Sequence, residues 1–261
     1  TRATEQISEG HFEARVDERR TDELGRLGQA INRMAARLAG FVTGQKRFLG
    51  DIAHELCSPL ARIQVALGIL EQRADDKQKA YVNDLREEVE QMSRLINELL
   101  SFSKAGLAAP EISMEPVNLA ATVRRALELE ASQTDQVWAQ VPDDLVVLAQ
   151  PDLLLRALAN LVRNAVRYAG QSGPITVSAQ RKTGAVMLAV ADQGPGVPEA
   201  SLQQIFDPFF RAEPSRSRDT GGIGLGLAIV KTCVEACQGT VSARNRAPQG
   251  LEVQILLKEA S

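Results

Sequence analysis

The sequence predicts a multidomain protein with an all-α half and an α+β half, in which a long helical hairpin precedes an α/β sandwich. Two observations predict the hairpin: apolar residues recur every three or four positions from Leu24 to Leu70, and again from Tyr81 to Phe102. A third predicts the sandwich, because helical patterns and short strand-like runs are mixed beyond residue 114. With 261 residues and 44% apolar side chains, the chain can form one large or two moderate domains.

The overall composition excludes several classes of protein. A formal net charge of −3 and the absence of dense Lys/Arg runs argue against nucleic-acid binding and against a polybasic membrane patch. No apolar stretch is long enough to span a bilayer, and the first residues do not resemble a signal peptide. We therefore expect the chain as given to be soluble. The three cysteines form neither a CxxC motif nor a plausible disulfide framework, which favours a reducing compartment, with the cytoplasm as the default, or simply inert thiols.

The first predicted helix is a rod of roughly 70 Å, at about 1.5 Å per residue. Its spacing is that of a coiled-coil heptad, interrupted by Gln45, with Gly40, Gly44 and Gly50 as weak points. The seam comprises Leu24, Leu27, Ile31, Met34, Leu38, Phe41, Phe48, Ile52, Leu56, Leu60, Ile63, Leu67 and Leu70.

A second seam follows a polar turn at residues 74–79, which predicts an antiparallel hairpin. The second seam comprises Tyr81, Leu85, Val89, Met92, Ile96, Leu99 and Phe102. One hairpin has too little core to be stable alone, so we expect residues 41–105 to pair with a second copy as a dimeric four-helix bundle.

Two prolines and the loss of helical periodicity predict a linker at 106–114, followed by the second domain at 115–261. Helical patterns there cover roughly 118–133, 151–168 and 224–237. The short strands are predicted from LVVL, ITVSA, VMLAV, TVSA and VQILL.

In NLVRNAVRY (160–168), Asn160 and Asn164 are four positions apart on one helical face. Their amide oxygens are suitable ligands for a hard cation such as Mg²⁺. A polar helix face explains an isolated pair of this kind more simply.

In DQGPGVP (192–198), Asp192 follows a strand and precedes Gly194 and Gly196. A carboxylate at this place can accept a hydrogen bond from the exocyclic amine of adenine, whereas the carbonyl of guanine would repel it. The glycines allow a base to approach the backbone closely. An ordinary turn accounts for the same residues equally well.

In GGIGLGLAIV (221–230), four glycines open a helix, and backbone N–H groups there can bind phosphates. The spacing fits neither the Rossmann fingerprint nor the P-loop. The preceding stretch has an apolar anchor (Phe206, Phe209 and Phe210) and basic residues suited to a lid over phosphates: Arg211, Arg216 and Arg218. A plain exposed loop is the simpler alternative.

His54 lies in DIAHELCSPL, about 200° around the helix from both Ile52 and Leu56, so we expect it to be exposed. An ordinary surface histidine is one interpretation. A neutral imidazole is also a nucleophile near pH 7, and Glu55 beside it could orient the ring or accept its proton. Because Pro59 cannot donate to the carbonyl of Glu55, we expect the helix to kink or loosen near His54.

Together these motifs resemble those of the sensor histidine kinases of bacterial two-component systems. HELCSPL resembles the H-box, NLVRNAVRY the N-box, DQGPG the first glycine box, IFDPFF the F-box and GGIGLGLAIV the second glycine box, in the family's order. EGHFEARV followed by DELGRLGQAINRMAARL resembles the second half of a HAMP relay, which would occupy residues 1–40.

The resemblance implies an ATP-binding sandwich of the GHKL (Bergerat) type. In such a site Asp192 would bind adenine, with Tyr168 stacked nearby and Arg167 near the phosphates. Asn164 would lie near Mg²⁺, with Asn160 as a second candidate. The resemblance implies a nucleotide site that also includes Gly194, Gly196, Phe209, Arg211, Gly222, Gly224, Leu225 and Gly226. His54 would accept the γ-phosphoryl group with Glu55 as base.

The resemblance further implies a homodimer whose phosphohistidine donates to an aspartate of a response regulator, which Arg62 and the second helix would help to recognise. Ser58, four residues after His54, would orient water for dephosphorylation of the regulator. The HAMP likeness implies the cytoplasmic portion of an inner-membrane protein whose membrane spans lie upstream. Cys57, Ser58 and Ile223 replace a basic residue, a threonine or asparagine, and a hydroxyl residue that are usual in the family.

Two other classes of protein would share some of these motifs. An ATPase of the chaperone and mismatch-repair class would share the nucleotide motifs but would not explain HELCSPL on a dimerising hairpin. A degenerate kinase that binds nucleotide as a signalling scaffold is disfavoured by the intact His54, Glu55 and Asn164.

Overall fold

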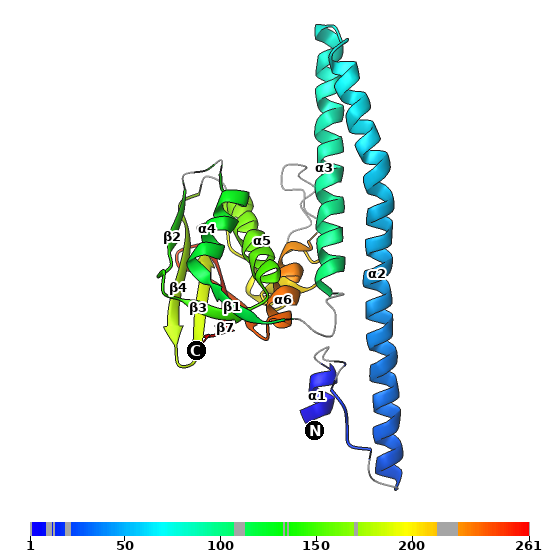
Figure 1. The fold of residues 1–261 in the computed structure, drawn as a ribbon, viewed down its shortest axis with the longest axis vertical. Helices are drawn as coiled ribbons and strands as arrows, with labels where there is room; N and C mark the ends of the chain where they lie inside the picture. Colours follow the sequence, from blue (N-terminus) through cyan, green and yellow to red (C-terminus); the bar gives the residue numbers. More distant parts are fainter. Residues whose placement is uncertain are drawn as a thin grey trace.

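A computed structural model describes residues 2–8, 12, 14–18, 22–106, 113–132, 134, 136–169, 172–212 and 224–260. It contains a long helical hairpin and an α/β sandwich packed beside the C-terminal end of the second hairpin helix (Figure 1). This arrangement confirms the predicted fold class.

The first long helix, α2 (Glu23–Glu71), is continuous over 49 residues and begins at an N-cap in which Asp22 Oδ1 accepts a hydrogen bond from Gly25 N. It also continues through Pro59 without a break, so the loosening expected near His54 is absent from the secondary structure. The proline removes only one helical hydrogen bond, and the carbonyl that loses its donor belongs to Glu55, an exposed residue that water can reach.

The N-terminal segment contacts the first turns of α2. A short helix, α1 (Arg2–Ser8), precedes an extended stretch in which Val16 is held by Asn32. The side chain of Asn32 accepts from Val16 N and donates to Val16 O, each at 2.9 Å. A Cβ atom on Gly28 would lie 2.8 Å from the carbonyl oxygen of Asp17, so this close packing requires glycine.

The second long helix, α3 (Asp76–Gly106), runs antiparallel to α2. The connecting turn is shorter than the predicted 74–79, because Asp75 Oδ1 accepts from Lys77 N and Gln78 N and so starts the helix early. The hairpin has its own small core of Leu67, Val82 and Val89.

The sandwich has a five-stranded sheet in the order β2-β4-β5-β7-β6, with β2 parallel to β4 and the other pairs antiparallel. A separate antiparallel pair joins β1 and β3. The strands are β1 (Glu115–Asn118), β2 (Val137–Gln140), β3 (Val146–Ala149), β4 (Ile175–Lys182), β5 (Ala185–Ala191), β6 (Thr240–Asn245) and β7 (Leu251–Lys258). The five predicted strands are all present, whereas β1 and β2 were not predicted.

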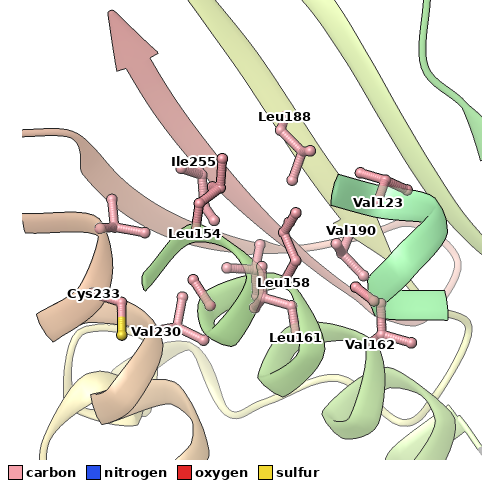
Figure 2. Close-up of a cluster of buried hydrophobic side chains, with 14 of the residues drawn as sticks. Val123, Leu154, Leu158, Leu161, Val162, Leu188, Val190, Val230, Cys233 and Ile255 are labelled. Atoms are coloured by element: carbon pink, nitrogen blue, oxygen red, sulfur yellow. The ribbon is translucent and has the colours of Figure 1, made fainter. Parts of the chain in front are cut away.

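Three α-helices of the sandwich correspond to the predicted helical patterns: α4 (Leu119–Glu130), α5 (Pro151–Ala169) and α6 (Gly226–Ala236). Two short 3₁₀ turns, η1 (Glu199–Ser201) and η2 (Gln204–Phe206), lie between β5 and α6. Figure 2 shows Leu154, Leu158 and Leu161 of α5 pointing toward Leu188 and Ile255 of the sheet. These side chains form the hydrophobic core that fixes α5 against the strands.

The hairpin and the sandwich meet at the C-terminal end of α3. Phe102 is 5% exposed and belongs to the sandwich core, and its ring packs edge-on against Phe209 with centroids 6.5 Å apart. Arg156 Nη1 of α5 donates to the carbonyl oxygen of Ser101 at 3.3 Å. These contacts join the end of the hairpin to α5 and to the segment after η2.

Candidate active site

The sandwich contains a cavity of about 640 Å³ between α5, the segment after β5, the segment after η2, and the start of α6. Four of the sequence motifs, NLVRNAVRY, DQGPG, IFDPFF and GGIGLGLAIV, contribute residues to its wall. The lining residues are Leu161, Asn164, Ala165, Arg167, Tyr168, Val190, Asp192, Pro195, Gly196, Val197, Pro198, Ile205, Phe210, Arg211, Ala212, Leu227, Leu251 and Val253.

Asp192 lies at the end of β5 and is 8% exposed. Its Oδ1 accepts hydrogen bonds from Gly194 N at 2.8 Å and Leu251 N at 3.1 Å, which fix the orientation of the carboxylate. Oδ2 has no hydrogen-bond partner among the described residues, and Asp192 lines the cavity. One oxygen is therefore held by the backbone while the other is left for a donor inside the cavity.

The structure separates the two asparagines of α5. Asn164 lines the cavity, and its side-chain amide lies so close to Gly226 that a Cβ atom there would be 2.9 Å from Asn164 Oδ1. Asn160 is 3% exposed, donates to Arg156 O at 2.8 Å, accepts from Arg163 at 2.7 Å, and is not among the lining residues. Asn164 is thus placed to meet a ligand in the cavity, and Asn160 is bonded within its own helix.

Arg167, Tyr168 and Arg211 bring cationic and aromatic groups to the cavity. The guanidinium carbon of Arg167 lies 5.9 Å from the ring centroid of Tyr168, and Tyr168 as a residue is 49% exposed. A positive group above an aromatic face suits a nucleotide, which offers a flat base and negative phosphates. Arg216, Arg218 and Gly222 lie outside the described residues.

The other residues predicted to form the nucleotide site contribute to the cavity in different ways. Gly196 lines it, and Gly194 packs against Asp192. Phe209 has a left-handed backbone (φ +67°), and its ring packs on Phe102 and is not among the lining residues. Leu225 is fully buried in the core, and Leu227 lines the cavity instead.

Gly224 also supports the wall from behind. Its φ is +78°, its carbonyl accepts from Phe209 N at 3.0 Å, and a Cβ atom on it would lie 2.6 Å from Phe210 O. A side chain would be both strained and obstructed there. This glycine therefore allows the segment carrying Phe210 to approach the start of α6.

His54, Glu55 and Ser58 are exposed on α2, as predicted for His54. Ser58 Oγ accepts a hydrogen bond from Arg62 Nη1 at 2.7 Å, one turn further along the same helix face. On the adjoining face, Gly50 packs against Ser103 of α3 and Ala53 is fully buried. The imidazole thus projects outward beside a helix face that packs against α3.

Three family models match successive parts of the chain. "HAMP domain" matches residues 1–40, "His Kinase A (phospho-acceptor) domain" matches 45–107, and "Histidine kinase-, DNA gyrase B-, and HSP90-like ATPase" matches 149–261. A solved structure of the mycobacterial sensor histidine kinase MprB is 30% identical to this chain, with a TM-score of 0.50, and the match covers 56% of this chain and 98% of the MprB chain. The chain belongs to the sensor histidine kinases.

Other relatives of this sensor kinase match most of the chain. The signal transduction histidine-protein kinase BaeS of Escherichia coli strain K12 is 32% identical over 97% of the chain, and the sensor histidine kinase CpxA of the same strain is 29% identical over 98%. The chain spans about half the length of these two relatives, 55% and 56%. A crystal structure of full-length ShkA in complex with AMPPNP matches with a TM-score of 0.67 and 30% identity, covering 82% of this chain and 46% of that chain.

Sequence reasoning missed the apolar walls of this kinase's cavity. Val197 and Pro198 adjoin the first glycine box, so their proximity to the motif was a usable signal. Leu251 and Val253 come from β7, which carries no motif, and only the pairing of β5 with β7 brings them beside Asp192. That register depends on the tertiary fold, so no local pattern indicates it.

Proposed function

We propose that this chain binds ATP in the cavity of the sandwich and transfers its γ-phosphoryl group to His54. The observation that carries the proposal is the convergence of Asp192, Asn164 and Arg211 on one cavity although they come from segments far apart in the sequence. Family membership supports the proposal independently, since a phospho-acceptor domain and an ATPase domain occur in one chain.

The cavity residues have separate roles in this proposal. Asp192 accepts a hydrogen bond from the exocyclic amine of adenine through Oδ2, and the ring of Tyr168 stacks near the base. Arg167 and Arg211 lie on the wall and neutralise phosphate charge. Asn164 offers an amide oxygen to Mg²⁺, which would neutralise charge on the transferring phosphoryl group.

In the transfer, an imidazole nitrogen of His54 forms a bond to the γ-phosphorus as the bond to the β,γ-bridging oxygen breaks, and ADP leaves. Glu55, next to His54, accepts the imidazole proton. His54 is exposed on α2, so both a nucleotide-bearing sandwich and a partner protein can reach it. The phosphoryl group then passes to an aspartate of a response regulator, with Arg62 on the docking face.

Ser58 supports a further reaction, the dephosphorylation of the regulator. Its hydroxyl lies one helical turn beyond His54 on the same exposed face, where it can orient water toward an aspartyl phosphate. The bond from Arg62 fixes the serine oxygen in that position.

The proposed assembly is a homodimer that forms the cytoplasmic portion of an inner-membrane protein. The exposed apolar side chains along α2 and α3 supply a surface for the second copy. The membrane location is supported by the HAMP match at residues 1–40. Within the described part of the chain, each helix is too short or too polar to traverse a bilayer.

Incubation of the chain with γ-labelled ATP and Mg²⁺ tests this function. We expect a label on the protein that is labile in acid and stable in alkali, and that is absent from His54→Ala. Phosphate release that persists in His54→Ala without protein labelling would indicate an ATPase instead. Nucleotide binding with neither activity would indicate a signalling scaffold.

Asn164→Asp provides a second test of the site. The added charge alters the ligand offered to Mg²⁺ and places a carboxylate beside Gly226, so we expect weaker autophosphorylation. Asn160→Asp is the matched variant, since Asn160 is on the same helix but is not among the lining residues. Undiminished labelling of Asn164→Asp would refute the role assigned to Asn164.

A further inference from the structure

The turn between β6 and β7 adjoins the cavity where β7 begins. Asn245 ends β6 and is paired in register with Leu251, which begins β7 and lines the cavity. Asn245 itself is half-buried and does not line the cavity. Neither the sequence motifs nor the family matches assign it a role.

Asn245 holds Val197 through both of that residue's backbone groups. Its Oδ1 accepts from Val197 N at 2.9 Å, and its Nδ2 donates to Val197 O at 2.6 Å. A third, longer bond joins Nδ2 to Glu199 Oε2 at 3.2 Å. One side-chain amide thus pairs with a single residue as a neighbouring strand would, and it fixes the position of a cavity-lining segment.

The glycine before Val197 makes this contact possible. Gly196 has a φ of +73°, and a Cβ atom on it would lie 2.9 Å from Asn245 Oδ1 and 3.2 Å from Gly250 O. A side chain there would be strained and would push the segment away from Asn245. The second glycine of DQGPGVP is therefore explained by the packing of Asn245 as well as by access for a base.

The same turn also holds the carboxylate of Asp192. Leu251 N donates to Asp192 Oδ1, and Arg246 Nη1 donates to Asp192 O at 3.2 Å. Gly250 (φ +117°) packs against the Asp192 carbonyl, whose carbon would lie 3.0 Å from a Cβ atom at that position. The β6–β7 turn is thus a common support for Asp192 and for the wall formed by Val197.

We propose that Asn245 is a positioning residue for the nucleotide base: by holding Val197 it sets the distance between that wall and the carboxylate of Asp192. It thereby controls the affinity for ATP and the preference for adenine over guanine. This inference rests on the proposed function, because it assumes that the base binds between Asp192 and Val197.

Asn118 provides a matched control in the same domain. Its Oδ1 accepts from Ala121 N at 2.7 Å and its Nδ2 donates to Asp143 O at 2.8 Å, the same two kinds of hydrogen bond that Asn245 makes. It caps α4, and none of these three residues lines the cavity. Asn118→Ala therefore loses similar hydrogen bonds in the sandwich without changing the base wall.

The experiment measures the Kd of the full 261-residue chain for ATP and for GTP by calorimetry, with the Tm read from the fluorescence of Trp138. For Asn245→Ala we expect an ATP Kd about tenfold higher, and a smaller ratio of GTP to ATP Kd. Asn118→Ala should lower the Tm to a similar extent and leave both Kd values unchanged. Glu199→Ala, which removes only the longer bond, should also leave them unchanged.

Asn245→Asp keeps the acceptor for Val197 N but loses the donor to Val197 O, so it tests the inference if Asn245→Ala fails to fold. We expect it to weaken ATP binding as well. The inference is overturned if the Asn245 variants bind ATP as the wild type does, or if Asn118→Ala weakens binding equally. Failure of the wild-type chain to bind ATP would refute the proposed function instead, which is a distinguishable outcome.

Discussion

The hairpin and the sandwich place their apolar residues in opposite environments. In the sandwich, Leu158, Leu188 and Ile255 are at most 1% exposed and belong to one continuous core. In the hairpin, Ile63 is 45% exposed and Leu85 is 54% exposed, although both belong to the predicted seams. The difference indicates that the sandwich buries its own core, whereas the hairpin requires a second surface to cover its apolar face.

The two regions also present their chemistry differently. His54 lies on an exposed helix face, where partners can approach it, whereas Asp192 lies in a walled cavity where backbone donors fix its orientation. The phosphoryl acceptor that we propose at His54 would have to meet a nucleotide domain and then a partner protein, so exposure suits that role. The base recognition that we propose for Asp192 needs fixed geometry, which the sandwich core supplies.

The largest expected effect comes from disrupting the core of the sandwich. Leu158→Ala removes a side chain that is 1% exposed between α5 and the sheet (Figure 2), and we expect a loss of about 3 kcal/mol in the free energy of unfolding. Trp138, the only tryptophan of the chain, lies in β2, so its fluorescence reports the unfolding of the sandwich. The Tm of that transition should fall by roughly 6–12 °C.

Leu129→Ala is the control for that substitution. Leu129 is on α4 and 50% exposed, so the same chemical change should cost less than about 1 kcal/mol. Equal losses for Leu129→Ala and Leu158→Ala would contradict the account of the sandwich as a self-contained core.

A charge in the seam of the hairpin should weaken association between two copies and leave the stability of the sandwich unchanged. Ile63→Glu places a carboxylate on the surface that we assign to the second copy, and we expect the dimer dissociation constant to rise more than about tenfold. The Tm reported by Trp138 should stay unchanged, because Ile63 lies outside the sandwich core. Analytical ultracentrifugation measures the dimer dissociation constant, and fluorescence measures the Tm.

Asn83→Glu adds the same carboxylate on the other side of α3, about 200° around the helix from Tyr81. Asn83 is exposed, and its substitution should leave association unchanged. If Asn83→Glu dissociates the chain as strongly as Ile63→Glu does, the seam is not the dimer surface.

The same contrast explains which features could be predicted from the sequence. The hairpin follows from periodicity alone, because its residues repeat one local geometry over many turns. The five predicted strands were recognisable from runs such as VMLAV. The strand β2 was missed because VWAQ is short and mostly exposed, with only Val137 packed against the core.

The candidate site was predictable only in part, because local patterns do not show which contacts the tertiary fold makes. Asp192 and Asn164 stand in motifs whose residue types indicate their chemistry. Asn160 matched the same spacing argument as Asn164, yet helix α5 turns its amide toward Arg163. The role proposed for Asn245 depends on a contact with Val197, 48 residues away in the chain, which no local pattern indicates.

The junction between the two regions gives a smaller, local prediction. Phe209 has a φ of +67°, a conformation that costs an L-residue about 1 kcal/mol and glycine almost nothing. Phe209→Ala and Phe209→Gly both lose the ring contact with Phe102, so their difference reports the backbone alone. We expect Phe209→Gly to be more stable by about 1 kcal/mol, measured by denaturant unfolding.

At a position inside a helix, the alanine variant should instead be more stable than the glycine variant. Arg125 lies within α4, where Arg125→Gly should be less stable than Arg125→Ala by a similar amount. Phe209→Ala matching or exceeding the stability of Phe209→Gly would show that the left-handed backbone is not retained in solution.

The smallest effect concerns thiol reactivity and leaves stability unchanged. Burial raises the pKa of Cys233 to about 12 and shifts the pKa of Cys237 in the same direction. Since only the thiolate reacts, and a thiol of pKa 12 is about one part in ten thousand ionised at pH 8, both sandwich cysteines should resist a thiol reagent until the domain unfolds. Cys57 lies on the partly exposed hairpin surface and should be modified first.

Mass spectrometry of the labelled chain identifies the modified cysteine, and Cys57→Ser should abolish the early reaction. Equally rapid labelling of Cys233 and Cys57 in the folded chain would mean that the sandwich opens readily, contrary to its continuous core.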